Sequence, residues 1–297
     1  MKPAPFEYFV PDTLQEALEL KAQHGDEGKA LAGGQSLIPA MNFRVAQPSV
    51  LIDLNRLDDL RFIREQNSEL HIGAMTLQSQ AETHALVAER APLLHEAIPQ
   101  IAHSQIRNRG TIGGSLAHAD PAAELPLVAI ALNARMRAQS QSGERWIDAR
   151  DFFAGLFATT LQQDEFLVEV AFPTMPARTG WAFMEIARRK GDYAMAGVGA
   201  LLTLDENGVC KSCRLVFLNV GDAPVEAAQA AESLLGKPPE RKRFEEAAAI
   251  ASQKEMSPFG NLHASAEYQR HLSAVLAQRA LTKAFERARA WNAKSSN

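Results

Sequence analysis

Two pairs of adjacent glycines, each at a junction between predicted elements, constrain the fold of this 297-residue chain more than any other feature. The first pair lies in AGGQS at 32–36, after an apolar run, and the second lies in TIGGS at 111–115. A glycine pair leaves successive backbone N–H groups free to face an anion with no side chain in the way. Two such corners, about eighty residues apart, could close on one pyrophosphate from opposite sides.

Neither corner identifies a ligand by itself, because a glycine pair at the end of a strand is often a plain turn. The fingerprint GxGxxG is absent from both corners, which disfavours a nicotinamide dinucleotide bound in the Rossmann manner.

Composition narrows the classes of function. With 46% hydrophobic and 22% charged residues, the chain is typical of a soluble globular protein. Lys and Arg number 31 against 35 Asp and Glu, a net charge of −4 that argues against a nucleic-acid partner. The N-terminus lacks the features of a secretory signal, and no stretch approaches the roughly 20 apolar residues of a membrane span. A cytoplasmic location without a membrane span is therefore expected.

The sequence offers no candidate for catalysis or metal binding. Cys210 and Cys213 form a CxxC within a predicted strand, and no other cysteine could complete a four-thiolate site, so two strand thiols are favoured. His103 and His118 flank the second corner, where structural histidines are commoner than general bases. There is no nucleophile elbow and no HExxH motif.

Hydrophobic periodicity predicts alternating short elements up to residue 175. Thr13 and Glu16 are predicted to form a capping box at a helix start, and 109–122 is predicted as a glycine-rich connection. The predicted strands are 6–10, 29–34, 49–54 and 165–173, with hairpins around 67–68 and 141–143; the predicted helices are 14–23, pieces of 77–101 broken at two prolines, 123–132 and 151–157.

A proline-containing linker at 174–180 precedes a different pattern. Three antiparallel strands are predicted, at 181–189, 196–205 and 213–220, followed by helices at about 224–235, 240–254 and 264–291. Strands followed by helices indicate an α+β class. The expected units are 1–56, 57–175 and 176–297.

Three motifs in this order, AGGQS, RNRGTIGGSLAHADPAAELP and RRKGDYAMAGVGALL, resemble the FAD-binding medium subunit of the molybdenum hydroxylases. This family includes carbon monoxide dehydrogenase, xanthine dehydrogenases and bacterial quinoline and nicotine dehydrogenases, and the resemblance covers nearly the whole chain. It implies an FAD fold of two subdomains, similar to the vanillyl-alcohol oxidase (PCMH) class, and a C-terminal domain of three antiparallel strands with a helical bundle.

The resemblance also implies which residues hold the flavin. The first corner would wrap the pyrophosphate, the second would close on it, two acids would bind the ribose or adenosine end, and further residues would lie along the cofactor or beside its ring. The residues at the pyrophosphate are Ala32, Gly33, Gly34, Gln35, Ser36 and Leu37 from the first corner, and Thr111, Ile112, Gly113, Gly114 and Ser115 from the second. The two acids are Asp120 and Glu124, and the further residues are Ile101, Leu167, Lys190 and Tyr193. Relatives often carry histidine where this chain has Gln35, so the FAD is expected to be noncovalent.

Several of these residues have a structural alternative. Glu124 suits the first turn of a helix, where the helix dipole favours an acid, and Asp120 suits a turn before proline. Ile101 and Leu167 would otherwise be core residues, and Tyr193 a strand residue. Lys190 belongs to a basic run that could stabilise a reduced flavin or could simply be solvated.

The family places molybdenum–pterin on a large subunit and two [2Fe-2S] clusters on a small subunit, assembled as a dimer of heterotrimers. This chain would accept electrons on FAD and pass them to an outside acceptor, with the flavin supplying the redox chemistry. Two alternatives stay open: a stand-alone FAD-dependent oxidoreductase of the same fold, and a non-catalytic module that binds another phosphate ligand. The sequence identifies neither the substrate nor the acceptor.

Overall fold

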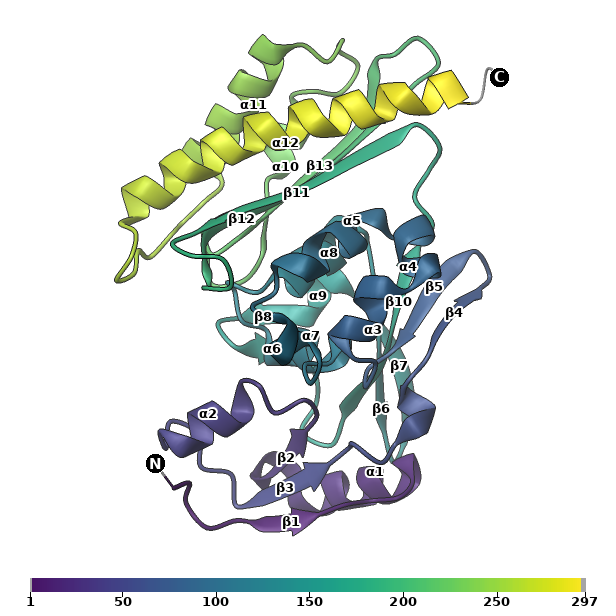
Figure 1. Cartoon of the computed structure of the whole chain (residues 1–297), viewed down its shortest axis with the longest axis vertical. Coiled ribbons are helices and arrows are strands. Elements are labelled where there is room, and N and C mark those ends of the chain that lie inside the picture. Colours follow the sequence, from purple (N-terminus) through teal and green to yellow (C-terminus); the bar gives the residue numbers. More distant parts are fainter. Residues whose placement is uncertain (1, 295–297) are drawn as a thin grey trace.

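The computed structural model describes residues 2–294, which form three units stacked along the long axis of the molecule (Figure 1). Each unit is built on its own sheet, of three, five and four strands, with helices packed on it. The expected α+β class is confirmed. In the described residues no helix is both long enough and apolar enough to cross a membrane.

The first unit is a parallel sheet in the order β1-β3-β2 with helix α1 against it. Its elements are β1 (Glu7–Phe9), α1 (Leu14–His24), η1 (Gly25–Glu27), β2 (Gly28–Leu31), α2 (Leu37–Asn42), β3 (Val50–Asp53) and η2 (Asp58–Leu60). Because β2 and β3 are parallel, the residues that follow them emerge at one edge of the sheet. That edge carries the first glycine corner.

The start of α1 differs from the predicted capping box. The Thr13 hydroxyl accepts the N–H of Glu16 at 3.2 Å, as a cap should. The Glu16 carboxylate, however, accepts the N–H of Asp12 at 2.9 Å. The N-cap is therefore present, but the Glu16 carboxylate bonds to the N–H of Asp12, one residue before the N-cap residue Thr13.

The second unit is an antiparallel sheet in the order β4-β5-β10-β6-β7, covered by short helices. Both predicted hairpins are confirmed, and positive φ angles of 53° and 62° at Asn67 and Ser68 form the first turn. The elements are β4 (Ile63–Gln66), β5 (Glu69–Gly73), α3 (Gln78–Thr83), α4 (Ala85–Arg90), α5 (Pro92–Ala97), η3 (Ile98–Gln100), α6 (Ser104–Arg107), α7 (Ile112–His118), α8 (Glu124–Ala131), β6 (Arg135–Ser140), β7 (Gly143–Asp148), α9 (Ala149–Phe152), β8 (Phe153–Gly155), β9 (Ala158–Thr159) and β10 (Phe166–Pro173).

The helix predicted at 151–157 is wrong. Helix α9 ends at Phe152, and β8 then pairs with β9 as a tight antiparallel ribbon. Gly155 and Phe157 have φ angles of 140° and 53°, which an α-helix cannot contain. This reversal brings the ribbon tip beside α7, with the rings of Phe157 and His118 5.1 Å apart.

The third unit confirms three long antiparallel strands, with a short fourth strand at the edge. Its elements are β11 (Thr179–Ala187), β12 (Ala194–Leu204), β13 (Cys210–Leu218), β14 (Val225–Glu226), α10 (Ala228–Glu232), α11 (Arg241–Lys254) and α12 (Ala266–Lys294). The first predicted helix starts late, because Val225 and Glu226 pair with β13 before α10 begins. The long helix α12 lies along β11 and β12 (Figure 1).

The cysteines of the CxxC lie on β13, as the strand interpretation predicts. Burial raises the pKa of Cys210 to about 11 and raises that of Cys213 as well. Thiols protonated at neutral pH are poor nucleophiles and poor metal ligands.

The sheet of the third unit is covered on both faces, because α5 and α8 of the second unit pack on it opposite α12. An ion-pair cluster fixes this contact: Glu96 lies 2.6 Å from Lys283 Nζ and 2.5 Å from Arg287 Nη1. The guanidinium of Arg287 also lies 4.9 Å from the centre of the Trp181 ring. The third unit is thereby held in one position over the second.

Candidate functional site

The two glycine corners lie against each other, although they belong to different units. A Cβ atom placed on Gly33 would come within 2.2 Å of the Arg109 carbonyl oxygen, far closer than any real contact. A Cβ on Gly114 would lie 3.4 Å from the Cβ of Ala32. The close approach of the first corner to the Arg109 carbonyl therefore requires a residue without a side chain at position 33.

The first corner presents unused hydrogen-bond donors. Gly34 has a φ of 71°, which reverses the chain between β2 and α2. Within residues 2–294, none of the backbone N–H groups at positions 33–37 donates a hydrogen bond to another group. The side-chain amide of Gln35 folds back and donates to the Gly33 carbonyl at 3.0 Å. The corner is thus a cluster of free amides next to a bare backbone.

The second corner is different, and the expectation that it leaves successive amides free is wrong. Ile112, Gly113 and Ser115 lie in the first turn of α7 rather than in an open connection. Their N–H groups are used: Ile112 donates to Thr76 O at 2.9 Å and Gly113 to Ala74 O at 2.8 Å.

The remaining amides of this turn are satisfied by Thr111, which caps the helix. Its hydroxyl accepts the N–H of Gly114 at 3.0 Å, and its carbonyl accepts that of Ser115 at 3.2 Å. The reason for Gly113 is packing, because a Cβ there would lie 2.4 Å from the Cβ of Ala74. The second corner supplies a rigid wall against which the first corner rests.

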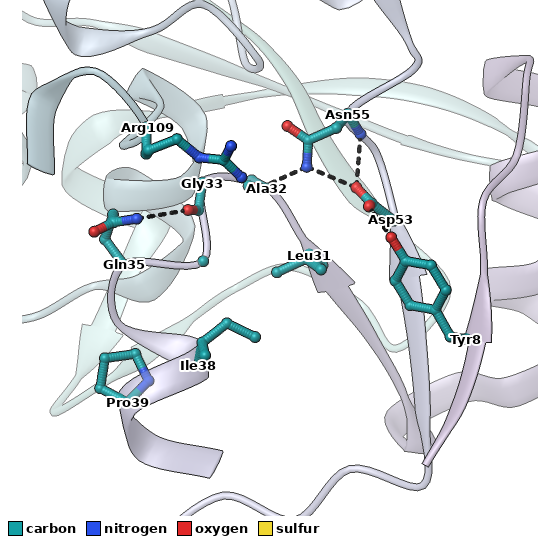
Figure 2. A pocket seen from close by; sticks show the side chains of 11 residues that line it. Tyr8, Leu31, Ala32, Gly33, Gln35, Ile38, Pro39, Asp53, Asn55 and Arg109 are labelled. Carbon is teal, nitrogen blue, oxygen red and sulfur yellow. Dashed lines mark hydrogen bonds between the residues drawn. The ribbon is translucent and has the colours of Figure 1, made fainter. Parts of the chain in front are cut away.

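A cavity of about 510 Å³ opens beside the first corner (Figure 2), within the size range of small-ligand sites. Ser36 and Leu37 are outside its lining. The lining residues are Tyr8, Leu31, Ala32, Gly33, Gly34, Gln35, Ile38, Pro39, Asp53, Asn55 and Arg109.

Four lining residues that the sequence interpretation missed give the site its polar character. The Nδ2 atom of Asn55 donates to the Ala32 carbonyl at 2.9 Å and to Asp53 Oδ1 at 2.6 Å, and Asp53 accepts from the hydroxyl of Tyr8 (Figure 2). Arg109 lines the cavity and makes no ion pair within the described part of the chain. Asn55 could have been identified from the sequence because it follows β3, which pairs in parallel with β2. Arg109 could have been identified because it directly precedes Gly110 at the second corner.

Asn55 is expected to position the first corner. In Asn55→Ala the Ala32 carbonyl loses its partner and the free amides lose their fixed direction, so affinity for the FAD that the family resemblance implies should fall by about fivefold. Isothermal titration of the full-length chain with FAD measures this change. Gln163→Ala is the control, since it removes an exposed side-chain hydrogen bond to Asp26 between residues outside the cavity lining; an equal loss of affinity in both variants would contradict the positioning role.

Three acidic side chains gather where the second and third units meet. Burial and then the charge of Asp120 raise the pKa of Glu124 to about 7. Burial and then the charge of Glu124 raise the pKa of Glu185 to about 8. Asp120 Oδ1 accepts the N–H of Ala122 at 2.9 Å, and Glu124 stands in the first turn of α8. Both acids lie where their structural alternatives place them, in a turn beside Pro121 and in the first turn of a helix, but at Glu124 burial outweighs the helix dipole. Sugar binding stays a proposal.

The cluster should make stability depend on pH. Glu185 has a buried Oε2 atom with no hydrogen bond inside residues 2–294. The Glu185 carboxyl group loses its proton near pH 4.5 in the unfolded chain and near pH 8 in the folded chain. The free energy of unfolding therefore falls as the pH rises between these values. In the flavin-free chain, Glu185→Gln should be more stable than wild type by up to roughly 2 kcal/mol at pH 8.5, and by much less at pH 5.

Thermal denaturation at these two pH values measures the difference. The control is Glu206→Gln, which removes an exposed carboxylate on the turn between β12 and β13. A Glu185→Gln advantage that is the same at pH 5 and pH 8.5 would rule out the titration.

The other predicted site residues are spread over this region. Ile101 and Leu167 belong with Ile112 to one buried core cluster, so their core role is confirmed. Tyr193 is 72% exposed. Lys190 is exposed and forms no ion pair with any described residue.

The flanking histidines have packing neighbours. A Cβ on Gly191 would lie 2.1 Å from His103 Cε1, so the ring fills the space beside the GDYA turn. Burial is the largest influence on His118 and lowers its pKa, which keeps the ring neutral near pH 7. The described residues contain no group of three or more His, Cys, Asp or Glu side chains placed to hold a metal ion.

Comparison with known families matches both parts of the chain. The family described as "FAD binding domain in molybdopterin dehydrogenase" matches residues 4–175. The family described as "CO dehydrogenase flavoprotein C-terminal domain" matches residues 181–284.

Individual relatives match over nearly their whole length. The chain is 43% identical to 6-hydroxypseudooxynicotine dehydrogenase complex subunit alpha of Paenarthrobacter nicotinovorans, covering 97% of each chain. It is 38% identical to the carbon monoxide dehydrogenase medium chain of Hydrogenophaga pseudoflava, covering 97% of this chain and 99% of the relative. Among solved structures, carbon monoxide dehydrogenase from Hydrogenophaga pseudoflava aligns with a TM-score of 0.93 at 39% identity, covering 97% and 99%. Quinoline 2-oxidoreductase from Pseudomonas putida aligns with 0.92 at 36% identity over the same shares.

Proposed function

The chain belongs to the family of FAD-binding medium subunits of molybdenum hydroxylases, and from that premise we propose that it carries electrons on a noncovalent FAD within such a complex. It would accept them from the [2Fe-2S] clusters of a small subunit and deliver them to an outside acceptor. The observation that carries this proposal is the bare first corner, with its free amides, facing a cavity that Arg109 also lines.

The residues present fit the diphosphate of FAD. Free backbone N–H groups and an unpaired guanidinium are strong donors to phosphate oxygens. Gly33 and Gly34 leave the backbone open to close approach, and Thr111 and Gly114 complete the wall on the other side. Bound here, FAD would supply chemistry in both one- and two-electron steps, with the protein setting its position and electrostatics.

The roles of the remaining predicted residues follow from their places. Asp120 and Glu124 lie beyond the C-terminal end of α7 and could accept hydrogen bonds from sugar hydroxyls. Gln35 cannot form the covalent link that a histidine can, which supports a noncovalent flavin. Tyr193 and Lys190 lie on the turn between β11 and β12, where they would face the ring.

The partners proposed are a large molybdenum–pterin subunit and a small iron–sulfur subunit, assembled as a dimer of heterotrimers. The names of the relatives support this, since they are a medium chain and a complex subunit of such dehydrogenases. The division at 56 and 175 is likewise a proposal, supported by the change from one sheet to the next near each position.

Purification of the native complex with flavin and metal analysis tests the proposal. We expect FAD on this chain, and molybdenum and iron on copurifying subunits. A flavin chain that turns over a substrate without partners would instead be a stand-alone oxidoreductase. A colourless chain that ignores added FAD would be a module for another phosphate ligand.

Arg109 should contribute to FAD affinity through its charge. Arg109→Gln is expected to weaken FAD binding by about tenfold at low salt and by less at high salt, because a charge-assisted bond to phosphate is lost. Fluorescence titration at two ionic strengths measures the loss. Lys211→Gln, which removes an exposed charge on β13, should leave the affinity unchanged; a loss independent of salt would contradict the electrostatic role.

A further inference from the structure

One arginine near the candidate site lies outside the cavity lining, yet it holds a residue on which the first corner depends. Arg61 stands on the connection between the first and second units, directly after η2. We propose that Arg61 is a positioning residue for the diphosphate site, because it braces Asn55, and through Asn55 the first corner, against the second unit. This inference rests on the proposed function and adds to it a residue that would not touch the ligand.

The backbone on either side of Arg61 is fixed to the second unit. The Leu60 carbonyl accepts the N–H of Met75 at 2.9 Å, and the Phe62 carbonyl accepts the N–H of Gly73 at 2.9 Å. The packing is close, since a Cβ placed on Gly73 would lie 2.3 Å from the Leu60 carbonyl oxygen. The base of the Arg61 side chain is therefore held by the end of β5 and not by the first unit.

The other end of this side chain reaches the first unit. Arg61 Nη2 donates a hydrogen bond to the backbone carbonyl of Asn55 at 2.7 Å. Asn55 follows β3, and its Nδ2 donates to the Ala32 carbonyl of the first corner at 2.9 Å (Figure 2). Two successive hydrogen bonds thus connect the second unit to the glycine corner.

Arg61 also determines which way the Asn55 amide faces. A guanidinium can only donate hydrogen bonds, so it attracts the oxygen end of the amide. Asn55 Oδ1 lies 3.5 Å from Arg61 Nη2, which leaves Nδ2 to face two acceptors, Ala32 O and Asp53 Oδ1. In the reversed orientation the amide oxygen would face these two oxygens, which repel it.

The bond to Asn55 is the main polar contact of Arg61 among the described residues. Its ion pair there joins Nε to Asp58 at 3.6 Å, and the Asp58 side chain is 91% exposed, so the pair contributes little. The Arg61 side chain is only 25% exposed, and a charge-assisted bond in such surroundings is stronger than a neutral one. Removing the guanidinium therefore removes the brace on the first corner.

Because Arg61 would act through Asn55, its effect should differ from that of Arg109. Arg109 lines the cavity and would attract the phosphates by its charge, an effect that salt screens. The brace acts through the positions of the free amides, which salt leaves unchanged. Ionic strength therefore separates the roles of the two arginines.

Titration of the full-length chain with FAD tests the brace in Arg61→Met, which keeps an unbranched apolar stem and removes every donor. FAD affinity should fall by about fivefold, at low and at high salt alike. The double variant Arg61→Met/Asn55→Ala should also lose about fivefold, rather than the roughly twenty-five-fold that two independent contributions would give.

Arg214→Met is the matched control, because Arg214 forms the same kind of brace between the second and third units. Its Nη1 donates to the Ile130 carbonyl at 2.9 Å and to the side-chain oxygen of Asn133, and its side chain is 18% exposed. These three residues are outside the cavity lining. This variant should melt at a lower temperature and bind FAD as wild type does.

Hydrogen exchange of the flavin-free chain gives a readout that needs no ligand. Leu54 N–H donates to the Leu31 carbonyl at 3.0 Å, and Leu57 N–H donates to the Leu54 carbonyl at 3.1 Å, on either side of Asn55. Both amides should exchange about fivefold faster in Arg61→Met, and at the wild-type rate in Arg214→Met.

Unchanged FAD affinity in Arg61→Met would overturn the brace, as would a loss confined to low salt, an additive loss in the double variant, or an equal loss in Arg214→Met. Unchanged exchange at Leu54 and Leu57 would overturn it without any ligand. A wild-type chain that binds no FAD would instead refute the proposed function, and the exchange rates would then decide the brace on their own.

Discussion

A Gly33→Ala variant is expected to fold and to bind FAD about a hundredfold more weakly than wild type. The added Cβ would lie 2.2 Å from the carbonyl oxygen of Arg109 and 2.8 Å from the Cα of Gly110. Both neighbours are backbone atoms, so the two corners must move apart. Several charge-assisted hydrogen bonds to the diphosphate would then be lengthened together, which accounts for a loss of about 3 kcal/mol.

Titration of the purified variant with FAD measures this loss, and far-ultraviolet circular dichroism checks the fold. Gly208→Ala is the control: nothing lies within 4 Å of an added Cβ there, and the strain of an alanine at its φ of 78° falls on the turn between β12 and β13 rather than on the corners. It should bind FAD as wild type does. Normal FAD affinity in Gly33→Ala would show that the contact between the corners is not needed for the site.

Gly180→Ala is expected to cause the largest loss of stability. This glycine lies where β11 presses on α12, and a Cβ there would be 1.8 Å from the Ala284 carbonyl oxygen and 2.5 Å from the Ala288 nitrogen. The helix must move off the sheet, which should cost about 3 kcal/mol or more. The melting temperature should drop by roughly 6–12 °C.

Calorimetry of the full-length chain checks this prediction against Gly197→Ala on the neighbouring strand. There an added Cβ would meet Leu218 Cγ at 3.0 Å and the Cβ of Glu185 at 3.1 Å, contacts that a shift of a few tenths of an ångström relieves. The control should therefore lose about 1 kcal/mol or less. Equal melting temperatures for both variants would mean that α12 does not constrain β11.

The sequence predicted most of the regular elements because their signals are local. The helix at 14–23 is observed at Leu14–His24, and the Asn67–Ser68 turn forms the expected hairpin. The predicted helix at 151–157 failed for a reason that periodicity cannot detect: a tight reversal at Gly155 and Phe157 interrupts an apolar run. A short edge strand likewise replaced the start of the helix predicted at 224–235.

The site was predicted less completely, because its contacts join distant parts of the chain. The glycine pairs marked both corners, but only the packing of Gly113 on Ala74 shows that the second pair serves the fold. Similarly, the distance between Asn55 and Ala32 depends on the pairing of β2 with β3. The position of Arg109 in the cavity lining depends on the contact between the first and second units. Local motifs located the corners, and tertiary structure assigned them different tasks.

Competition binding with fragments of FAD tests the central claim most directly, that the first corner holds the diphosphate. The full-length chain is titrated with FAD, and then with ADP or riboflavin as competitor. We predict one FAD per chain, displaced by ADP, with riboflavin far weaker because it lacks the phosphates that the free amides and Arg109 would bind. Riboflavin binding as tight as FAD, with no displacement by ADP, would contradict the account.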